Sequence, residues 1–146
     1  EMRESDWSSD VCSSDLIAIL ICAVLLYFAI NLTKPHKIHL DKEKFQHNWL
    51  KIENSVKKDE PATWHLALIN ADKLVDTALR ELHFSGQTMG ERLKSAKDKL
   101  SSPNSIWHAH KLRNVIAHEA DAEINFDQTR RALASFKQAL KDLGAI

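Results

Sequence analysis

From Asp41 to the C-terminus, apolar side chains recur at intervals of three and four residues, and no stretch alternates in the way that strands do. The only glycines in the chain are Gly86, Gly90 and Gly144. A spacing of three and four places apolar side chains on one face of a helix, where they can be buried against other helices. The pattern therefore predicts an all-α fold.

Five amphipathic helices are expected in this region. The first covers residues 42–58, and the second residues 61–83, because an acidic pair followed by proline is typical of a helix start. A T-x-x-E capping box at Thr88 predicts the third helix. The fourth covers about residues 105–118, and the fifth follows a similar capping sequence at Asn125. Four or five helices with short connections predict a helical bundle.

Residues 6–16 read DWSSDVCSSDL, which resembles the in-frame translation of a sequencing-library adapter. We interpret residues 1–16 as an artefact of sequence assembly, and they contribute nothing to the predicted fold. Without them, residues 17–146 carry 19 Lys and Arg against 15 Asp and Glu. This mildly basic balance is compatible with an RNA partner but too small to indicate nucleic-acid binding by itself.

Leu16 to Ile30 form a run of fifteen residues without a charged side chain. A membrane-spanning helix needs about 20 apolar residues, so the run is short, but the adapter-like segment interrupts its upstream side. A cleaved signal peptide and a buried core helix are the alternatives. No small-x-small cleavage site follows the run, which favours a transmembrane helix over a signal peptide.

Lysines are concentrated just after the apolar run, and basic residues next to a membrane span favour the cytoplasmic side. We therefore expect a single-pass protein of the cell membrane. Its transmembrane anchor would be residues 17–33, its juxtamembrane linker residues 34–41, and its cytoplasmic bundle residues 42–146.

The fourth predicted helix carries the polar side chains His110, Arg113, Asn114 and His118. Arginine presents a planar fork of donors that fits phosphate oxygens, and histidine transfers protons near neutral pH. His110, Asn114 and His118 recur every four residues and share one stripe, whereas Arg113 lies about 140° around the helix from His118. Arg113 and His118 can act together if the arginine wraps round the helix, if the helix ends near His118, or if a second subunit completes the site. We expect a homodimer in which the fourth helices face each other across the interface.

A simpler interpretation gives these side chains no chemistry. Arg113 would be a solvated helix residue, and His118 a cation favoured by the negative end of the helix dipole. A metal site fits poorly, because His108 and His110 point to different sides and because His110 and His118 lie about 12 Å apart along the helix axis. We expect neither a metal nor a cofactor.

An arginine followed by asparagine and by a histidine near the end of a late helix, in a small α-helical bundle, resembles the motif of the HEPN domain superfamily. The matching residues are Arg113, Asn114 and His118, and the resemblance covers residues 42–146. A tyrosine that follows the histidine by two residues in a toxin branch of the superfamily is replaced here by Ala120. Membership of that branch is therefore not expected.

The resemblance implies a HEPN-like bundle that cleaves single-stranded RNA without a metal. Arg113 would bind the scissile phosphate, His118 would transfer protons at the 2′-hydroxyl or the leaving oxygen, and Asn114 would orient them, with His110 in support. Other members bind nucleotides or lack activity. The alternative is therefore a catalytically silent, membrane-tethered bundle that binds RNA, a nucleotide or a protein partner.

Overall fold

The computed structural model describes residues 10–32, 40–119 and 123–146. These residues form six α-helices and a short 3₁₀ turn, with no strand among them, so the predicted all-α class is confirmed for this part of the chain. The chain divides into two compact units, residues 1–37 and residues 38–146, and each is described by itself. The helices are α1 (Asp10–Leu32), α2 (Lys42–Ser55), α3 (Pro61–Glu81), α4 (Met89–Ser95), α5 (Pro103–His118) and α6 (Phe126–Asp142), with the 3₁₀ turn η1 (Lys97–Lys99) after α4.

The first unit contains α1, which begins inside the adapter-like segment. Its large apolar side chains between Leu16 and Ile30 are each more than half exposed. Among the described residues, no helix is both long and apolar enough to cross a membrane. The anchor predicted at residues 17–33 stays a prediction, and most of the predicted linker, residues 34–41, lies outside the described residues.

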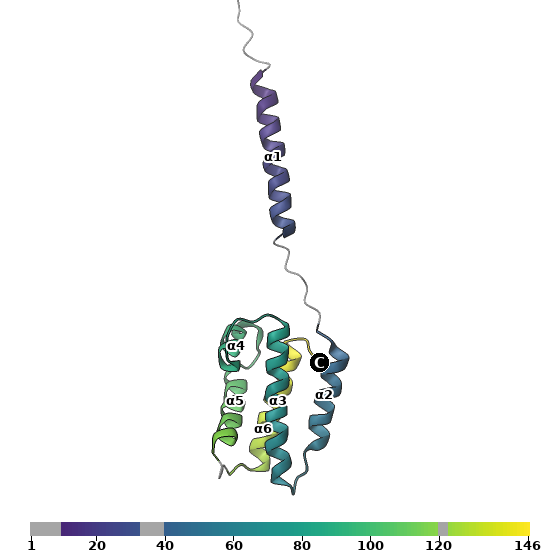
Figure 1. Cartoon of the computed structure of the whole chain (residues 1–146), viewed down its shortest axis with the longest axis vertical. Coiled ribbons are helices and arrows are strands. Elements are labelled where there is room, and N and C mark those ends of the chain that lie inside the picture. Colours follow the sequence, from purple (N-terminus) through teal and green to yellow (C-terminus); the bar gives the residue numbers. More distant parts are fainter. Residues whose placement is uncertain (1–9, 33–39, 120–122) are drawn as a thin grey trace, which may run out of the picture. The chain divides into compact units, whose positions relative to one another are not determined.

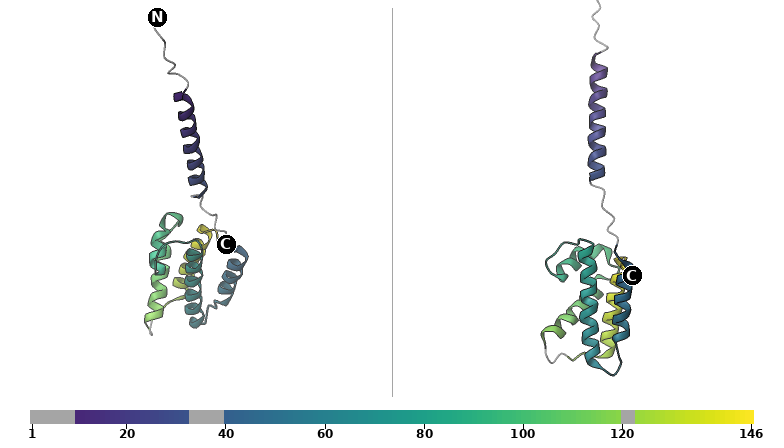
Figure 2. Two further views of the ribbon diagram at one scale, coloured as in Figure 1. Left: turned by 45° about the horizontal axis from the view of Figure 1, so that its top comes forward. Right: turned by 45° about the vertical axis from the view of Figure 1, so that its right-hand side comes forward.

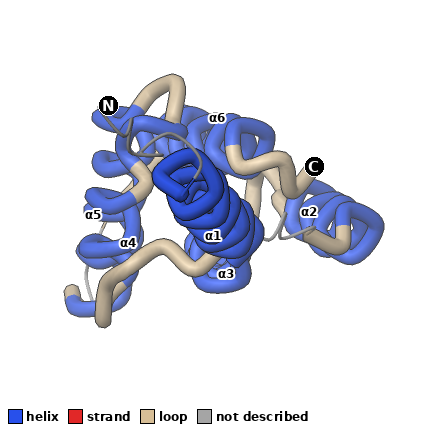
Figure 3. Tube along the Cα trace, turned by 90° about the horizontal axis from the view of Figure 1, so that it is seen from above, coloured by secondary structure: helices blue, strands red, loops and turns tan. Residues whose placement is uncertain are grey.

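The second unit is a helical bundle built around α3. This helix packs against α2, α4, α5 and α6, and Figure 1 shows it between α2 and α5. Viewed along the bundle in Figure 3, α2, α3, α5 and α6 surround a common core, and the turned views in Figure 2 agree. The largest fully buried side chains are Phe45, Leu68, Val75, Leu79, Ile106, Thr129, Phe136 and Leu140.

Local sequence explains where most of these helices begin. Thr88 accepts a hydrogen bond from the Glu91 backbone while the Glu91 side chain bonds back to Thr88, so the predicted capping box is present. Asn125 and Gln128 form the second box at the start of α6. Proline occupies the first turn of α3 and of α5, where its missing N–H costs little.

Three predicted helix boundaries were wrong by a few residues. α2 ends at Ser55 rather than near residue 58, because Val56 adopts an extended conformation. α3 ends at Glu81, and His83, which was expected within the helix, takes a left-handed φ of 58°. α5 begins at Pro103, two residues before the expected start.

Candidate functional site

A cleft of about 590 Å³ opens between α3, α4 and α5. The helices α3 and α5 form its two walls, and the start of α4 with the residues before it closes one end. Four cations and two carboxylates line it, so positive charge is in excess. They are Lys73, Arg80, Arg92, Arg113, Asp72 and Asp76.

Arg113 and Asn114 from α5 enter this cleft and join a closed ring of polar side chains with His110 and Asp72. The Arg113 Nη1 group donates to Asn114 Oδ1 at 3.0 Å. Asn114 Nδ2 lies 3.2 Å from His110 Nε2, and His110 Nδ1 lies 2.7 Å from Asp72 Oδ1. Arg113 Nε lies 3.2 Å from Asp72 Oδ2, which closes the ring as an ion pair.

The ring sets the direction of its hydrogen bonds. A guanidinium can only donate, so Asn114 must turn its oxygen to Arg113 and its N–H group to His110. His110 Nε2 therefore accepts, and Nδ1 carries the proton that is donated to the Asp72 carboxylate.

One edge of the Arg113 guanidinium lies against other side chains, and the other edge has no hydrogen-bond partner among the described residues. Its Nε–H is buried and makes no hydrogen bond with a described residue, although Asp72 lies within ion-pair distance. Its Nη2 group has no hydrogen-bond partner among the described residues, and the side chain is 30% exposed. Asp72 and Asn114 therefore orient the guanidinium while its outer N–H groups stay available to an anion from solvent.

A second charged cluster fixes the far end of the cleft. Arg92 is buried and donates through Nε to Asp76 Oδ1 at 2.8 Å and through Nη1 to the Gly86 carbonyl at 2.7 Å. Arg80 Nη2 lies 2.6 Å from the other Asp76 oxygen. These contacts attach the segment before α4 to α3, so the cleft has a fixed rim.

The capping box at the start of α4 shapes the same rim. Hydrogen bonds from the backbone N–H groups of Gln87 and Thr88 hold the pKa of Glu91 below its ordinary value of 4.5. Gly90 permits close packing beside the cleft, since a Cβ there would lie only 3.3 Å from the ring of Trp107. Both features place backbone of α4 directly at the cleft opening.

His118 does not line the cleft, so within one chain it does not join Arg113 there. It is the last residue of α5 and is exposed, and its side chain makes no hydrogen bond or ion pair with another described residue. Arg113 turns toward Asp72 on α3 instead of wrapping toward His118. Asn114 likewise contacts His110 and Arg113 rather than His118, so the predicted polar stripe forms only at His110 and Asn114.

Asp72, Asp76 and Arg92 are parts of the site that sequence reasoning missed. Asp72 is 3% exposed and lies four residues after the buried Leu68 in the long apolar stripe of α3. An acidic side chain inside such a stripe needs a partner when it is buried. That single signal could have indicated a site on this helix.

No protein-family model, curated protein or solved structure matches this chain. Among the described residues, no group of three or more His, Cys, Asp or Glu side chains is arranged to hold a metal ion. The chemistry of the cleft must therefore be inferred from its own side chains.

Proposed function

We propose that this protein is a membrane-tethered, HEPN-like domain whose α3–α4–α5 cleft binds the phosphodiester backbone of single-stranded RNA through Arg113. One observation carries the proposal. Asp72 and Asn114 orient the Arg113 guanidinium, and its Nη2 group makes no hydrogen bond with a described residue. An arginine fixed in this way loses little side-chain entropy when a phosphate binds, and its fork of donors matches two phosphate oxygens.

The charge of the cleft supports the same ligand class. Asp76 is neutralised by Arg80 and Arg92, and Asp72 by Arg113, whereas Lys73 makes no ion pair with a described residue. An excess of positive charge in a cleft attracts polyanions such as the phosphate backbone of RNA.

We further propose that catalysis, where it occurs, uses Arg113 of one chain and His118 of a second. Within one helix these residues are separated by about 7.5 Å along the axis and about 140° around it. A two-fold dimer with the α5 helices facing each other would place two motifs across one interface.

In that site, His118 would remove the proton of the 2′-hydroxyl, whose oxygen then attacks the adjacent phosphorus. The bond to the 5′-oxygen breaks, and the leaving oxygen takes up a proton. The products are a 2′,3′-cyclic phosphate and a 5′-hydroxyl end. Arg113 would stabilise the charge that develops on the phosphate oxygens, and the ring of His110 and Asp72 would keep Arg113 and Asn114 in place.

The second candidate is a catalytically silent bundle that binds RNA, a nucleotide or a protein partner. The position of His118 outside the cleft favours it, because one chain then holds Arg113 in the cleft without His118 beside it.

Arg113→Gln should weaken binding of an oligouridylate by about 10- to 100-fold, since a hydrogen bond to a charged group contributes about 1.5–3 kcal/mol. Fluorescence anisotropy with the full-length chain in nonionic detergent and EDTA measures this. Arg131→Gln on α6 is the matched control, because it removes an exposed arginine that lies outside the cleft. Equal affinities for the two variants would contradict the proposal.

The tether is proposed from the uncharged run in α1. Its fifteen residues extend about 22 Å as a helix, against a hydrocarbon core of about 30 Å, and the lysines after it favour a cytoplasmic bundle. Trypsin added to inverted vesicles should digest residues 34–146, whereas right-side-out vesicles should protect them. Digestion of the bundle in right-side-out vesicles would contradict the proposed orientation. Release of the protein from washed membranes would contradict the proposed tether.

A further inference from the structure

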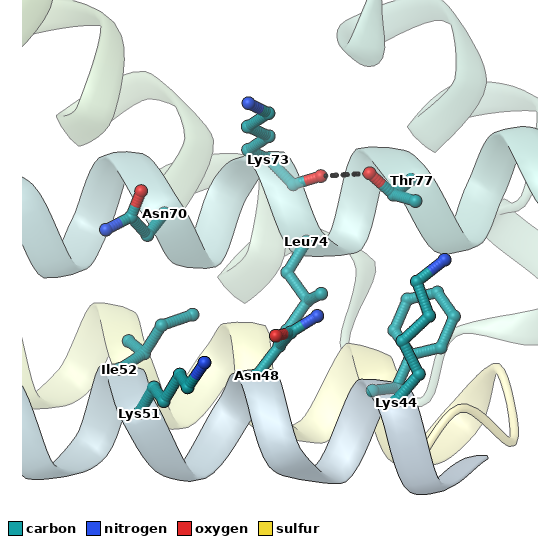
Figure 4. A pocket seen from close by; sticks show the side chains of 9 residues that line it. Lys44, Asn48, Lys51, Ile52, Asn70, Lys73, Leu74 and Thr77 are labelled. Carbon is teal, nitrogen blue, oxygen red and sulfur yellow. Dashed lines mark hydrogen bonds between the residues drawn. The ribbon is translucent and has the colours of Figure 1, made fainter. Parts of the chain in front are cut away.

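A second groove, of about 360 Å³, lies between α2 and α3 on the bundle. Figure 4 shows the two rows of polar side chains that line it, one on each helix. Lys44, Asn48 and Lys51 follow one another on α2 at intervals of four and three residues. Asn70, Lys73 and Thr77 follow one another on α3 at intervals of three and four. Each set therefore lies along one face of its helix. The groove is a trough that follows both helices.

The floor of this trough is apolar and closed. Phe45, Ile52 and Leu74 line it, and all three belong to the buried core. A ligand therefore rests on an apolar surface between the two rows of polar side chains and does not enter the core. This geometry suits an elongated ligand better than a compact one.

The charge of the trough is entirely positive. Among the described residues, three lysines line it and no carboxylate does. Lys44 Nζ lies 3.5 Å from Glu81 Oε1, but both side chains are well exposed, so this pair contributes little. Lys51 and Lys73 make no ion pair with a described residue. These two cations are uncompensated and available to an anion.

Lys73 connects the trough with the Arg113 cleft. It lines both, and in Figure 4 it extends from α3 away from α2. Positive side chains therefore continue from Arg113 on α5, over Lys73 on α3, to Lys51 on α2. A strand with regularly spaced negative charges could follow this line, whereas a single small anion would occupy only one part of it.

We propose that the α2–α3 trough binds the continuation of a single-stranded RNA whose scissile phosphodiester lies in the Arg113 cleft. This inference rests on the proposed function. Lys73 and Lys51 contact successive parts of the backbone, and the apolar floor packs against sugars or bases. The amides of Asn48 and Asn70 offer both donors and acceptors to base edges. The trough thus makes the protein prefer long strands to dinucleotides.

The test measures the binding of a long and a short oligonucleotide to the full-length chain in nonionic detergent with EDTA. Lys51→Gln should weaken binding of an oligouridylate of about 12 nucleotides by roughly threefold to tenfold near 0.1 M salt. It should also lower the salt slope by about 0.7, the value for one phosphate contact in single strands. Binding of a uridine dinucleotide should not change. Lys141→Gln removes an exposed lysine of α6 that lines neither groove and should alter neither ligand.

Two results would overturn the inference while leaving the proposed function intact. In the first, Arg113→Gln weakens binding at both lengths but Lys51→Gln matches the wild type in affinity and slope. In the second, Lys51→Gln leaves RNA binding unchanged but weakens binding of a soluble anionic lipid headgroup, glycerol phosphate, which assigns the trough to a lipid headgroup. If Arg113→Gln affects neither RNA length, the proposed function fails and the inference fails with it.

Discussion

Replacing His118 by alanine is expected to reduce cleavage of single-stranded RNA by about 10²- to 10⁴-fold, the usual effect of removing a general acid–base residue. His118 is exposed at the end of α5 and touches no other described side chain through a hydrogen bond or ion pair. The substitution should therefore leave folding unchanged. Cleavage of a labelled RNA by the full-length chain, in EDTA, measures the effect. His108→Ala, an exposed histidine on the same helix, is the matched control.

A mixing experiment separates a composite site from a site within one chain. Arg113→Gln and His118→Ala should each be inactive alone. Because a two-fold dimer holds two equivalent sites, random mixing of the two variants should restore about a quarter of the sites. No recovery in mixed dimers would place both residues in one chain. Equal background cleavage of RNA by the wild type and both variants, with unchanged circular dichroism spectra, would contradict the ribonuclease proposal and favour the silent bundle.

Asp72→Ala is expected to lower the free energy of unfolding by about 2–3 kcal/mol. Asp72 is buried and accepts from His110 while it pairs with Arg113, so its loss leaves a buried donor and a partly buried cation without their partner. Urea unfolding of the full-length chain in detergent measures the change. The same variant should bind RNA less tightly, because Arg113 is no longer held in one orientation.

Asp72→Asn and Asp59→Ala are the controls for this effect. The asparagine can still accept from His110 Nδ1 but no longer neutralises Arg113, so we expect a smaller loss of stability than for alanine. Asp59 is exposed in the turn before α3, and its removal should change little. Equal unfolding midpoints for Asp72→Ala and Asp59→Ala would mean that the ring around Arg113 does not stabilise the bundle.

Much of the fold could be predicted because its signals are local. The capping sequences at Thr88 and Asn125 act within four residues, and the proline of α3 acts within one turn. Helix ends were less predictable. The left-handed φ of His83 depends on how the segment after α3 returns to the bundle, and local spacing does not determine that path.

The candidate site could be predicted only in part, for a related reason. Spacing within one helix correctly joined His110 to Asn114. It could not tell that Arg113 would face Asp72, because that contact depends on how α3 and α5 pack against each other. The role of Arg92 was equally difficult to predict. It belongs to a basic stretch typical of a solvated helix face, and yet it is buried against Asp76.

Photo-crosslinking of a thiouridine-substituted RNA to the full-length protein tests the central claim most directly, because it locates bound RNA without any substitution in the chain. If the Arg113 cleft binds the backbone, crosslinked peptides should come from residues 87–92 at the start of α4 and from residues 110–114 of α5, which line it. Excess unlabelled RNA should abolish these crosslinks. Crosslinks confined to the exposed face of α6, around Arg130 and Arg131, would contradict the claim.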